Sequence, residues 1–246
     1  HTVQIFGDPV FTYSYREAVV DGYLIDHEPP YRISTQLSDD GIVFKKDENL
    51  DLFDTKTGAV HSTRAPDEIA FEVDEFNKKV ITVPFNRVVC EELVNHIDPS
   101  LPGKTLIFAA TDAHADIVVD QLKKAYVAAG IPIEDGAIKK LTGSVDKVQT
   151  HIRSYRDDAN PKIAVTVDLL TTGIDVPSIT NLVFLRRVNS RILYEQMLGR
   201  ATRLCPDIGK ETFRIFDAVD LYANLQDVTA MKPVVVNPQI SLTQLM

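Results

Sequence analysis

Short apolar runs alternate with amphipathic segments between about Lys104 and Asp217. A strand that is buried on both faces shows such an unbroken apolar run, whereas a surface helix shows apolar residues at a spacing of three or four. We expect strands at 105–110, 137–143, 162–167, 181–185 and 212–217, and helices at 112–129, 145–157 and 190–204. The alternation predicts an α/β fold, a mostly parallel sheet with helices on both faces.

The first 100 residues have a less regular pattern, which predicts an irregular α+β segment with a hairpin. A Pro/Gly break at 97–104 gives the boundary, with an accessory segment over 1–100 and the main α/β domain over 101–246. Within the accessory segment we expect helices at 14–24, 67–78 and 86–97 (with Val89, Leu93 and Ile97 inward), a hairpin at 31–46 turning at 39–41, and a poorly ordered or looped stretch at 47–66.

Charge is unevenly distributed along the chain. Hydrophobic residues make up 44% and charged residues 25%, an ordinary globular balance, and the net charge of −9 argues against nucleic acid as a partner. However, residues 1–100 carry 19 acidic and 9 basic residues, and residues 181–214 carry seven basic against three acidic. Attraction to phosphate is local, so 181–214 can be either a phosphate-binding surface or a solvated basic face.

Two cysteines, Cys90 and Cys205, lie far apart and in no metal-ligand spacing. Structural thiols in a reducing cytoplasm are the simplest interpretation, and we expect no metal site in the chain. No apolar run approaches the roughly 20 residues that span a bilayer. The first residues lack a signal-peptide pattern and a Met, which suggests a fragment of a longer chain.

Polar residues follow the expected strands. In parallel sheets ligands bind where the strands end, and this edge would carry the loops after 110, 142, 167 and 185. Thr111, Thr142 and Gly143 suit contacts with nucleic-acid phosphates, and the two threonines are equally good helix N-caps. His114 has no spaced partners and indicates a structural role, while 186–187 (Arg-Arg) can face phosphate or solvent.

The sequence YEQMLGRATR spans 194–203 and carries a glutamine and two arginines. In a continuous helix Gln196, Arg200 and Arg203 share one stripe, with Leu193, Met197, Ala201 and Leu204 on a neighbouring buried stripe. An arginine fork can hold two phosphate oxygens and stays charged. The alternative is a surface helix whose arginines form internal salt bridges.

The sequence DLLTTGIDVP spans 168–177 and follows an expected strand. Gly173 permits a tight turn, and Asp175 can accept from a ribose hydroxyl or hold an arginine. Thr171 and Thr172 suit a nucleic-acid phosphate. An ordinary strand-to-loop turn with Asp175 as a helix cap is the alternative.

Together these segments resemble motifs V and VI of superfamily 2 helicases, the second with the pattern Q-x-x-G-R-x-x-R. LIFAATDAHAD (106–116) resembles motif IV, and LTGSVDK (141–147) the Thr-Gly segment between motifs IV and V. The four motifs cover about 104–217. In addition, FGDPVFTYSYREAVVDGYL (6–24) is similar to the motor (R, or restriction) subunit of type I restriction enzymes, where it leads from the first motor lobe into the second.

The resemblance implies a second RecA-like motor lobe of an ATP-dependent double-stranded DNA translocase. It implies an arginine finger at Arg203 helped by Arg200, a water or phosphate oriented by Gln196, and nucleotide contacts near Gly173, Asp175 and Gly199. DNA contacts are implied at Thr111, Thr142, Gly143, Thr171 and Thr172. Implied partners are the N-terminal motor lobe and nuclease domain of the parent chain, and methylation and specificity subunits.

The chain lacks the phosphate loop that a nucleotide-hydrolysing motor needs. The segment 98–105 fails because Asp98 replaces the first glycine and Lys104 precedes a strand, and the acidic stretch at 67–70 follows no apolar strand. We therefore expect ATP and Mg²⁺ to be bound mainly by the first lobe and the fragment alone to be inactive. The alternatives are a lobe of another DNA-repair or RNA helicase, or a non-catalytic nucleotide- or protein-binding module; a metabolic Rossmann enzyme is disfavoured because no G-x-G-x-x-G follows a strand.

Overall fold

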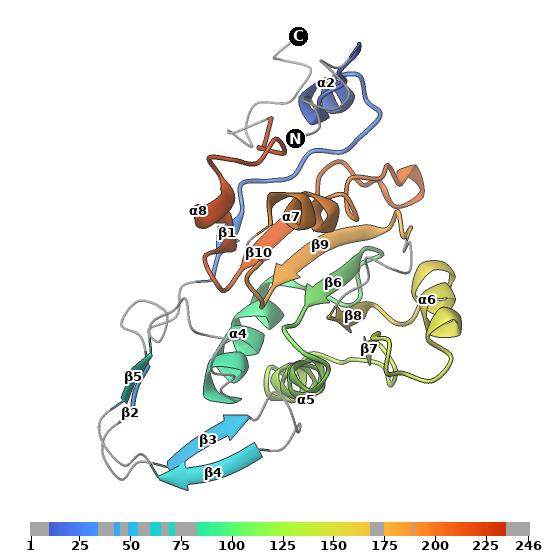
Figure 1. The fold of residues 1–246 in the computed structure, drawn as a ribbon. Helices are drawn as coiled ribbons and strands as arrows, with labels where there is room; N and C mark the ends of the chain where they lie inside the picture. The colour runs from blue at the N-terminus through green and yellow to red at the C-terminus, as the bar shows by residue number, and fades with distance from the viewer. Residues whose placement is uncertain are drawn as a thin grey trace.

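A six-stranded parallel sheet forms the centre of the protein (Figure 1). The computed structural model describes residues 10–33, 42–44, 49–53, 60–64, 69–71, 83–167, 175–188 and 190–234. The strand order is β1-β10-β9-β6-β8-β7, and every neighbouring pair is parallel. The strands are β1 (Tyr31–Arg32), β6 (Lys104–Phe108), β7 (Ile138–Lys140), β8 (Ile163–Thr166), β9 (Ile179–Phe184) and β10 (Arg214–Asp217). This confirms the expected α/β fold.

Helices cover both faces of this sheet (Figure 1). One face packs on α4 (Val83–His96) and α5 (Asp112–Ala128). The other packs on α6 (Val148–Asp157), α7 (Arg191–Leu198) and α8 (Leu221–Leu225). The short α2 (Tyr15–Val20) precedes the sheet in the chain, and its N-terminus is closed by a capping box between Ser14 and Glu17.

The apolar runs form the sheet because alternate residues of each strand enter opposite layers. In β6, Leu106 and Phe108 join the core under α6 and α7, whereas Ile107 joins the core under α4 and α5. All three are at most 4% exposed, and burying each such side chain stabilises the fold by about 1.5–3 kcal/mol. The expected inward positions Val89, Leu93 and Ile97 are likewise buried.

The expected hairpin at 31–46 is wrong. β1 pairs with β10, with Tyr31 beside Phe216, and β2 (Ile42–Phe44) pairs with β5 (Ile69–Phe71). The turn expected at 39–41 lies outside the described residues. These strands pair with residues distant in the sequence, and a local pattern of apolar and polar residues does not reveal such a partner.

Two further expectations in the first 100 residues are wrong. β5 occupies 69–71, inside the helix expected at 67–78. Within 47–66, expected to be poorly ordered or a loop, β3 (Asn49–Phe53) and β4 (Val60–Arg64) form an antiparallel pair. The alternation of Leu50 and Leu52 around an aspartate was the available signal for a strand.

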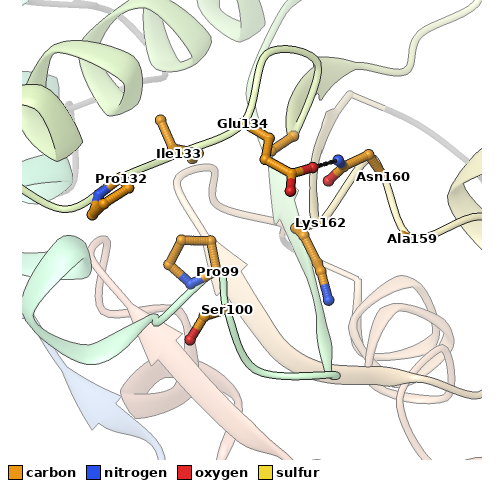
Figure 2. Close-up of a pocket in the computed structure, with 9 residues that line it drawn as sticks. Pro99, Ser100, Pro132, Ile133, Glu134, Ala159, Asn160 and Lys162 are labelled. Carbon is orange, nitrogen blue, oxygen red and sulfur yellow. Dashed lines mark hydrogen bonds between the residues drawn. The ribbon is translucent and has the colours of Figure 1, made fainter.

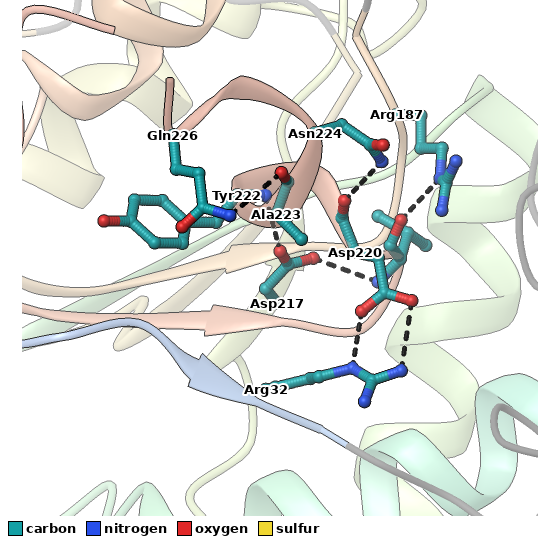
Figure 3. Close-up of polar contacts among 9 residues, drawn as sticks. Arg32, Arg187, Asp217, Asp220, Tyr222, Ala223, Asn224 and Gln226 are labelled. Atoms are coloured by element: carbon teal, nitrogen blue, oxygen red, sulfur yellow. Dashed lines mark hydrogen bonds and ion pairs between the residues drawn. The ribbon is translucent and has the colours of Figure 1, made fainter. Parts of the chain in front are cut away.

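Contacts tie residues 10–33 to the main sheet. Arg32 of β1 donates from Nε and Nη2 to the carboxylate of Asp220, the residue just before α8 (Figure 3). Beside it the buried Asp217 accepts from the amides of Val219 and Tyr222, at 3.0 and 2.7 Å. With α4 also in the core, parts of 1–100 and 101–246 share one folded body, and the division at residue 100 stays a prediction.

Neither cysteine forms a disulfide: Cys90 is buried under α5, and Cys205 is partly exposed. Burial raises the pKa of the Cys90 thiol, which keeps it in its neutral form. Among the described helices none is long and apolar enough to cross a bilayer.

Candidate functional site

The helix that carries Gln196 is shorter than expected. Ser190 caps its N-terminus by accepting from the amide of Leu193 at 3.3 Å, and α7 ends at Leu198 with Gly199 as its C-cap. The helix expected over 190–204 is therefore wrong beyond Leu198, and so is the single helical stripe, because Arg200 and Arg203 lie after the helix.

Of the four side chains expected on the buried stripe, one is exposed. Met197 and Ala201 are buried and Leu193 packs partly against the core, as expected, whereas Leu204 is 46% exposed. A side chain at Gly199 would lie 3.3 Å from the carbonyl oxygen of Glu195, so this glycine relieves a crowded contact within the turn. Its role beside a nucleotide stays a prediction.

Arg203 forms an ion pair with Asp175, with 3.3 Å between Nε and Oδ1. The two side chains are 59% and 57% exposed. An exposed pair of this kind contributes at most about 1 kcal/mol, so it can be exchanged for another anion at little cost. Gln196 is exposed and Arg200 is half-buried, so all three expected catalytic side chains reach the surface to some degree.

This pair lies near the amino ends of the strands. Asp175 lies four residues before β9, and Lys210 lies four residues before β10. Lys210 donates to the carbonyl of Pro177, in the segment of Asp175, and to the carbonyl of Arg203 itself. The helix α7 begins after β9 ends and brings the chain back to the start of the sheet. The arginine segment and the loops after the strands therefore occupy opposite edges, which the sequence did not indicate.

At the carboxyl edge Thr111 acts as a helix cap. Its Oγ1 accepts from the amide of His114 at the start of α5, at 3.1 Å. The ring of His114 is fully buried: Nδ1 accepts from the amide of Ala110 at 3.0 Å, and Nε2 donates to Oδ1 of Asn86 at 2.8 Å. Burial lowers the pKa of His114 to about 3, so the ring is neutral and its role is structural, as expected.

Thr142 is bound into a carboxylate cluster at the same edge. Its hydroxyl and that of Ser144 donate to Oδ1 of Asp112, and Lys140 donates to Oδ2 at 2.9 Å. Burial would raise the pKa of Asp112, but the hydrogen bonds from Ser144, Thr142 and Lys140 lower it below the usual range. Lys140 also donates to Asp116 at 2.8 Å, and its own pKa is raised by these partners against the effect of burial.

The remaining candidates at this edge are Gly143, two arginines after β9, and three residues that follow β8 in the chain. Gly143 is open, with no atom within 4 Å of an added side chain. Arg186 donates to the carbonyl of Val167 at 2.7 Å, and Arg187 donates to that of Val219 (Figure 3). Both arginines thus hold backbone loops. Thr171, Thr172 and Gly173 lie in 168–174, outside the described residues.

Comparisons with known proteins identify the family of the domain that carries these residues. Residues 86–205 match the profile of the "Helicase conserved C-terminal domain" family. Residues 86–205 form a helicase C-terminal domain. Over 249 aligned residues it is 49% identical to the type I restriction enzyme EcoKI endonuclease subunit of Escherichia coli K12, covering 100% of this chain and 21% of that protein.

Two solved structures share the fold of this helicase domain. A fragment of a putative HsdR subunit of a type I restriction enzyme from Vibrio vulnificus YJ016 superposes with a TM-score of 0.62 and 23% identity, over 94% of this chain and 39% of that one. The type ISP restriction-modification enzyme LlaBIII bound to DNA gives 0.54 and 17%, over 88% and 13%. The chain spans about a fifth of the length of its curated EcoKI relative.

The helicase domain also has a pocket of about 470 Å³ (Figure 2). It lies by the loops that precede β6, β7 and β8, with the Lys162 side chain on one side and a hydrogen bond between Asn160 and Glu134 on another. Within the described part of the chain no group of three or more His, Cys, Asp or Glu side chains is arranged to hold a metal ion.

Sequence reasoning missed two lysines that hydrogen-bond to segments of the candidate site, Lys140 and Lys210. Lys210 lies in the polar stretch PDIGKET, which gives no sign of burial, yet the residue is only 9% exposed. Lys140 follows the expected strand pattern but was not linked to Asp112. Lys140 lies 28 residues from Asp112, and Lys210 lies 7, 9 and 33 residues from its three carbonyl partners, so the motifs themselves contained no signal for these contacts.

Proposed function

We propose that the chain is the second motor lobe of an ATP-dependent double-stranded DNA translocase, in the R subunit of a type I restriction endonuclease. The observation that carries this proposal is the exposed guanidinium of Arg203, paired only weakly with Asp175 at the surface. The first motor lobe, facing this edge, would bring a nucleotide within reach of that group. The likeness to EcoKI over the whole chain supports the restriction family.

Hydrolysis of a nucleoside triphosphate requires positive charge and exact placement around the γ-phosphate more than covalent help. On lobe closure, Arg203 would leave Asp175 for phosphate oxygens, which its planar fork can bind in pairs. Asp175 would then be available to a ribose hydroxyl or to hold the arginine in its new position. Arg200 adds charge from the same turn, and Gln196 on α7 orients a water or a phosphate oxygen.

Triphosphate binding and Mg²⁺ binding belong, in this proposal, to the first lobe. The helicase family uses ATP and Mg²⁺ in the full protein, but no phosphate loop occurs in this sequence. The chain alone would therefore be inactive, and its contribution is the arginine segment that completes the site.

DNA would bind at the carboxyl edge, through the loops that begin α5 and follow β7. The open backbone at Gly143 and the amides near Thr111 and Thr142 suit phosphate oxygens, with Thr171 and Thr172 completing the contact. A structural neighbour, LlaBIII, was solved bound to DNA. The parent chain would add a nuclease domain, and methylation and specificity subunits would complete the assembly.

The test is DNA-stimulated ATP hydrolysis by the full-length parent protein carrying Arg203→Ala. We expect the turnover number to fall by on the order of 10³-fold, with ATP and DNA binding retained. The matched control is Arg191→Ala, an exposed arginine of α7 that also faces a carboxylate, Glu195 at 4.0 Å, and that should leave turnover unchanged. Turnover near wild type in Arg203→Ala would overturn the proposal.

A further inference from the structure

Every carbonyl of the segment Ala201–Arg203 accepts a hydrogen bond from another part of the chain. The Nζ of Lys210 donates to the carbonyls of Ala201 and Arg203, at 2.7 and 2.8 Å. The amide of Ile25 donates to the carbonyl of Thr202 at 2.8 Å. Because the segment lies after α7, these contacts replace the helical hydrogen bonds that would otherwise fix its backbone.

The same ammonium group also reaches the loop that carries Asp175. Lys210 donates to the carbonyl of Pro177 at 2.9 Å. A lysine ammonium has three N–H donors, and here each meets one carbonyl oxygen. A single buried cation thus joins the two segments whose side chains, Arg203 and Asp175, pair at the surface.

A tight turn brings Lys210 back beneath the arginine segment. Cys205 and Lys210 form an antiparallel bridge around the 3₁₀ turn Pro206–Ile208, and Gly209 adopts the left-handed conformation, with φ of 61°. Burial lowers the pKa of Lys210 to about 8, which leaves the group mostly protonated at neutral pH. The side chain therefore keeps its three donors under ordinary conditions.

We propose that Lys210 is a positioning residue for Arg203: by fixing the carbonyls of Ala201, Arg203 and Pro177, it sets the place from which the arginine reaches a nucleotide bound by the facing lobe. This inference rests on the proposed function of Arg203. Lys210 itself is buried and does not contact the nucleotide. Displacing a reacting group by about 1 Å can lower a rate by on the order of 10²-fold, so a backbone contact can control turnover.

Lys104 provides a matched control. It is 5% exposed, its Nζ donates to the carbonyls of Asp158 and Pro161 at 2.8 and 2.9 Å, and burial lowers its pKa to about 8. The chemistry is the same as at Lys210, but the carbonyls belong to the loop before β8. Lys104→Met should therefore measure the general cost of losing a buried ammonium.

The experiment compares Lys210→Met, Lys104→Met and their combinations with Arg203→Ala in the full-length parent protein. We expect Lys210→Met to lower the turnover number of DNA-stimulated ATP hydrolysis by about 10- to 100-fold, with the KM for ATP and the Kd for DNA within about 2-fold of wild type. In the Arg203→Ala background the same substitution should change turnover by less than about 2-fold, because its effect passes through the arginine. Lys104→Met should leave turnover unchanged relative to its own background, wild type in one case and Arg203→Ala in the other.

The outcomes separate this inference from the function on which it rests. If Arg203→Ala abolishes turnover but Lys210→Met does not lower it, only the positioning role is overturned. Equal losses from Lys210→Met in both backgrounds, or equal losses from the two lysine variants, also overturn it. If Arg203→Ala leaves turnover intact, the proposed function fails first. Should Lys210→Met not fold, Lys210→Gln, which keeps two donors, is measured in the same cycle against the same criteria.

Discussion

The two edges of the sheet use polar groups in opposite ways. At the carboxyl edge, side chains hold the structure: Thr111 caps α5, and Thr142 binds the carboxylate of Asp112. At the amino edge, backbone carbonyls are the groups held, by Lys210 and Ile25, and the side chain of Arg203 remains exposed. When the backbone is fixed through its carbonyls, the side chain stays free to move toward a ligand. A side chain that caps a helix is instead occupied by its hydrogen bond to the backbone.

The largest expected effect tests whether the amino edge needs the arginine fork or only its charge. Arg203→Lys keeps the positive charge but loses the planar pair of donors. We expect it to recover little of the roughly 10³-fold loss seen on removing an arginine finger. The turnover number of the full-length protein with saturating ATP and DNA is the measurement, with Arg191→Lys as the control. If Arg203→Lys turned over as fast as wild type, the positive charge at this position would be sufficient and the planar guanidinium would not be needed.

The next largest effect concerns the stability of the carboxyl edge. His114→Ala removes the acceptor of the Ala110 amide and the donor to Asn86, and it leaves a cavity beside α5. We expect the free energy of unfolding of the chain to fall by roughly 3 kcal/mol. Chemical denaturation measures this, and Lys123→Ala on the exposed side of α5 is the control. A loss below 1 kcal/mol would show that the buried ring does not hold this edge.

The same histidine predicts a pH dependence. Its pKa is about 3 in the folded protein and near 6.5 when unfolded, so the unfolded chain binds the proton more readily. The full contribution of His114 to the free energy of unfolding is present above pH 6.5. It falls by up to about 1.4 kcal/mol per pH unit as the pH drops toward 3. His114→Gln should unfold with a shallower dependence between pH 6.5 and 4. An unchanged slope would contradict the buried neutral ring.

A smaller effect tests whether DNA approaches the carboxyl edge. Lys140→Ala exposes the charges of Asp112 and Asp116, which Lys140 now neutralises. We expect the Kd for double-stranded DNA to rise by about 2- to 5-fold at low salt, with a smaller change at high salt. Fluorescence anisotropy of labelled DNA measures this in the full-length protein. Lys124→Ala, which breaks a comparable pair with Asp120, should not change the Kd; equal effects would place DNA elsewhere.

The smallest effect concerns the link between β1 and α8. Arg32→Ala removes a bidentate contact with Asp220, but the arginine side chain is 55% exposed and the pair is screened by solvent. We expect the free energy of unfolding to fall by less than about 1 kcal/mol. Thermal unfolding of the chain is sufficient to measure it. A loss above 2 kcal/mol would indicate that this pair, and not the strand pairing, holds the first segment to the sheet.

The strands of the sheet could be predicted because their burial is visible locally. The apolar runs LIF (106–108) and IAV (163–165) lie within β6 and β8, and both strands form at nearly the expected residues. The end of α7 could not be predicted in this way. The sequence after Gly199 is compatible with helix, and its carbonyls turn instead toward Lys210 and Ile25, which lie 7 or more residues away along the chain.

The sequence motifs predicted which residues belong to the candidate site, but not how those residues are arranged in space. The motifs indicated Arg203 and Asp175, which the structure brings to 3.3 Å, and Thr142, which it buries in a carboxylate cluster. The sequence did not indicate that the arginines and the threonines lie at opposite edges. That separation follows from the path of α7 across the sheet, which depends on packing of Tyr194 and Met197 against the core.

The outer strands of the sheet bear on the behaviour of the protein at high concentration. The row of unpaired backbone groups on an outer strand is a template for pairing with another molecule, as in aggregation or domain swapping. Here β1 has two residues and ends in Arg32, and β7 has three, including Lys139 and Lys140. A second copy would gain few hydrogen bonds at either border. The short outer strands therefore disfavour intermolecular sheet extension.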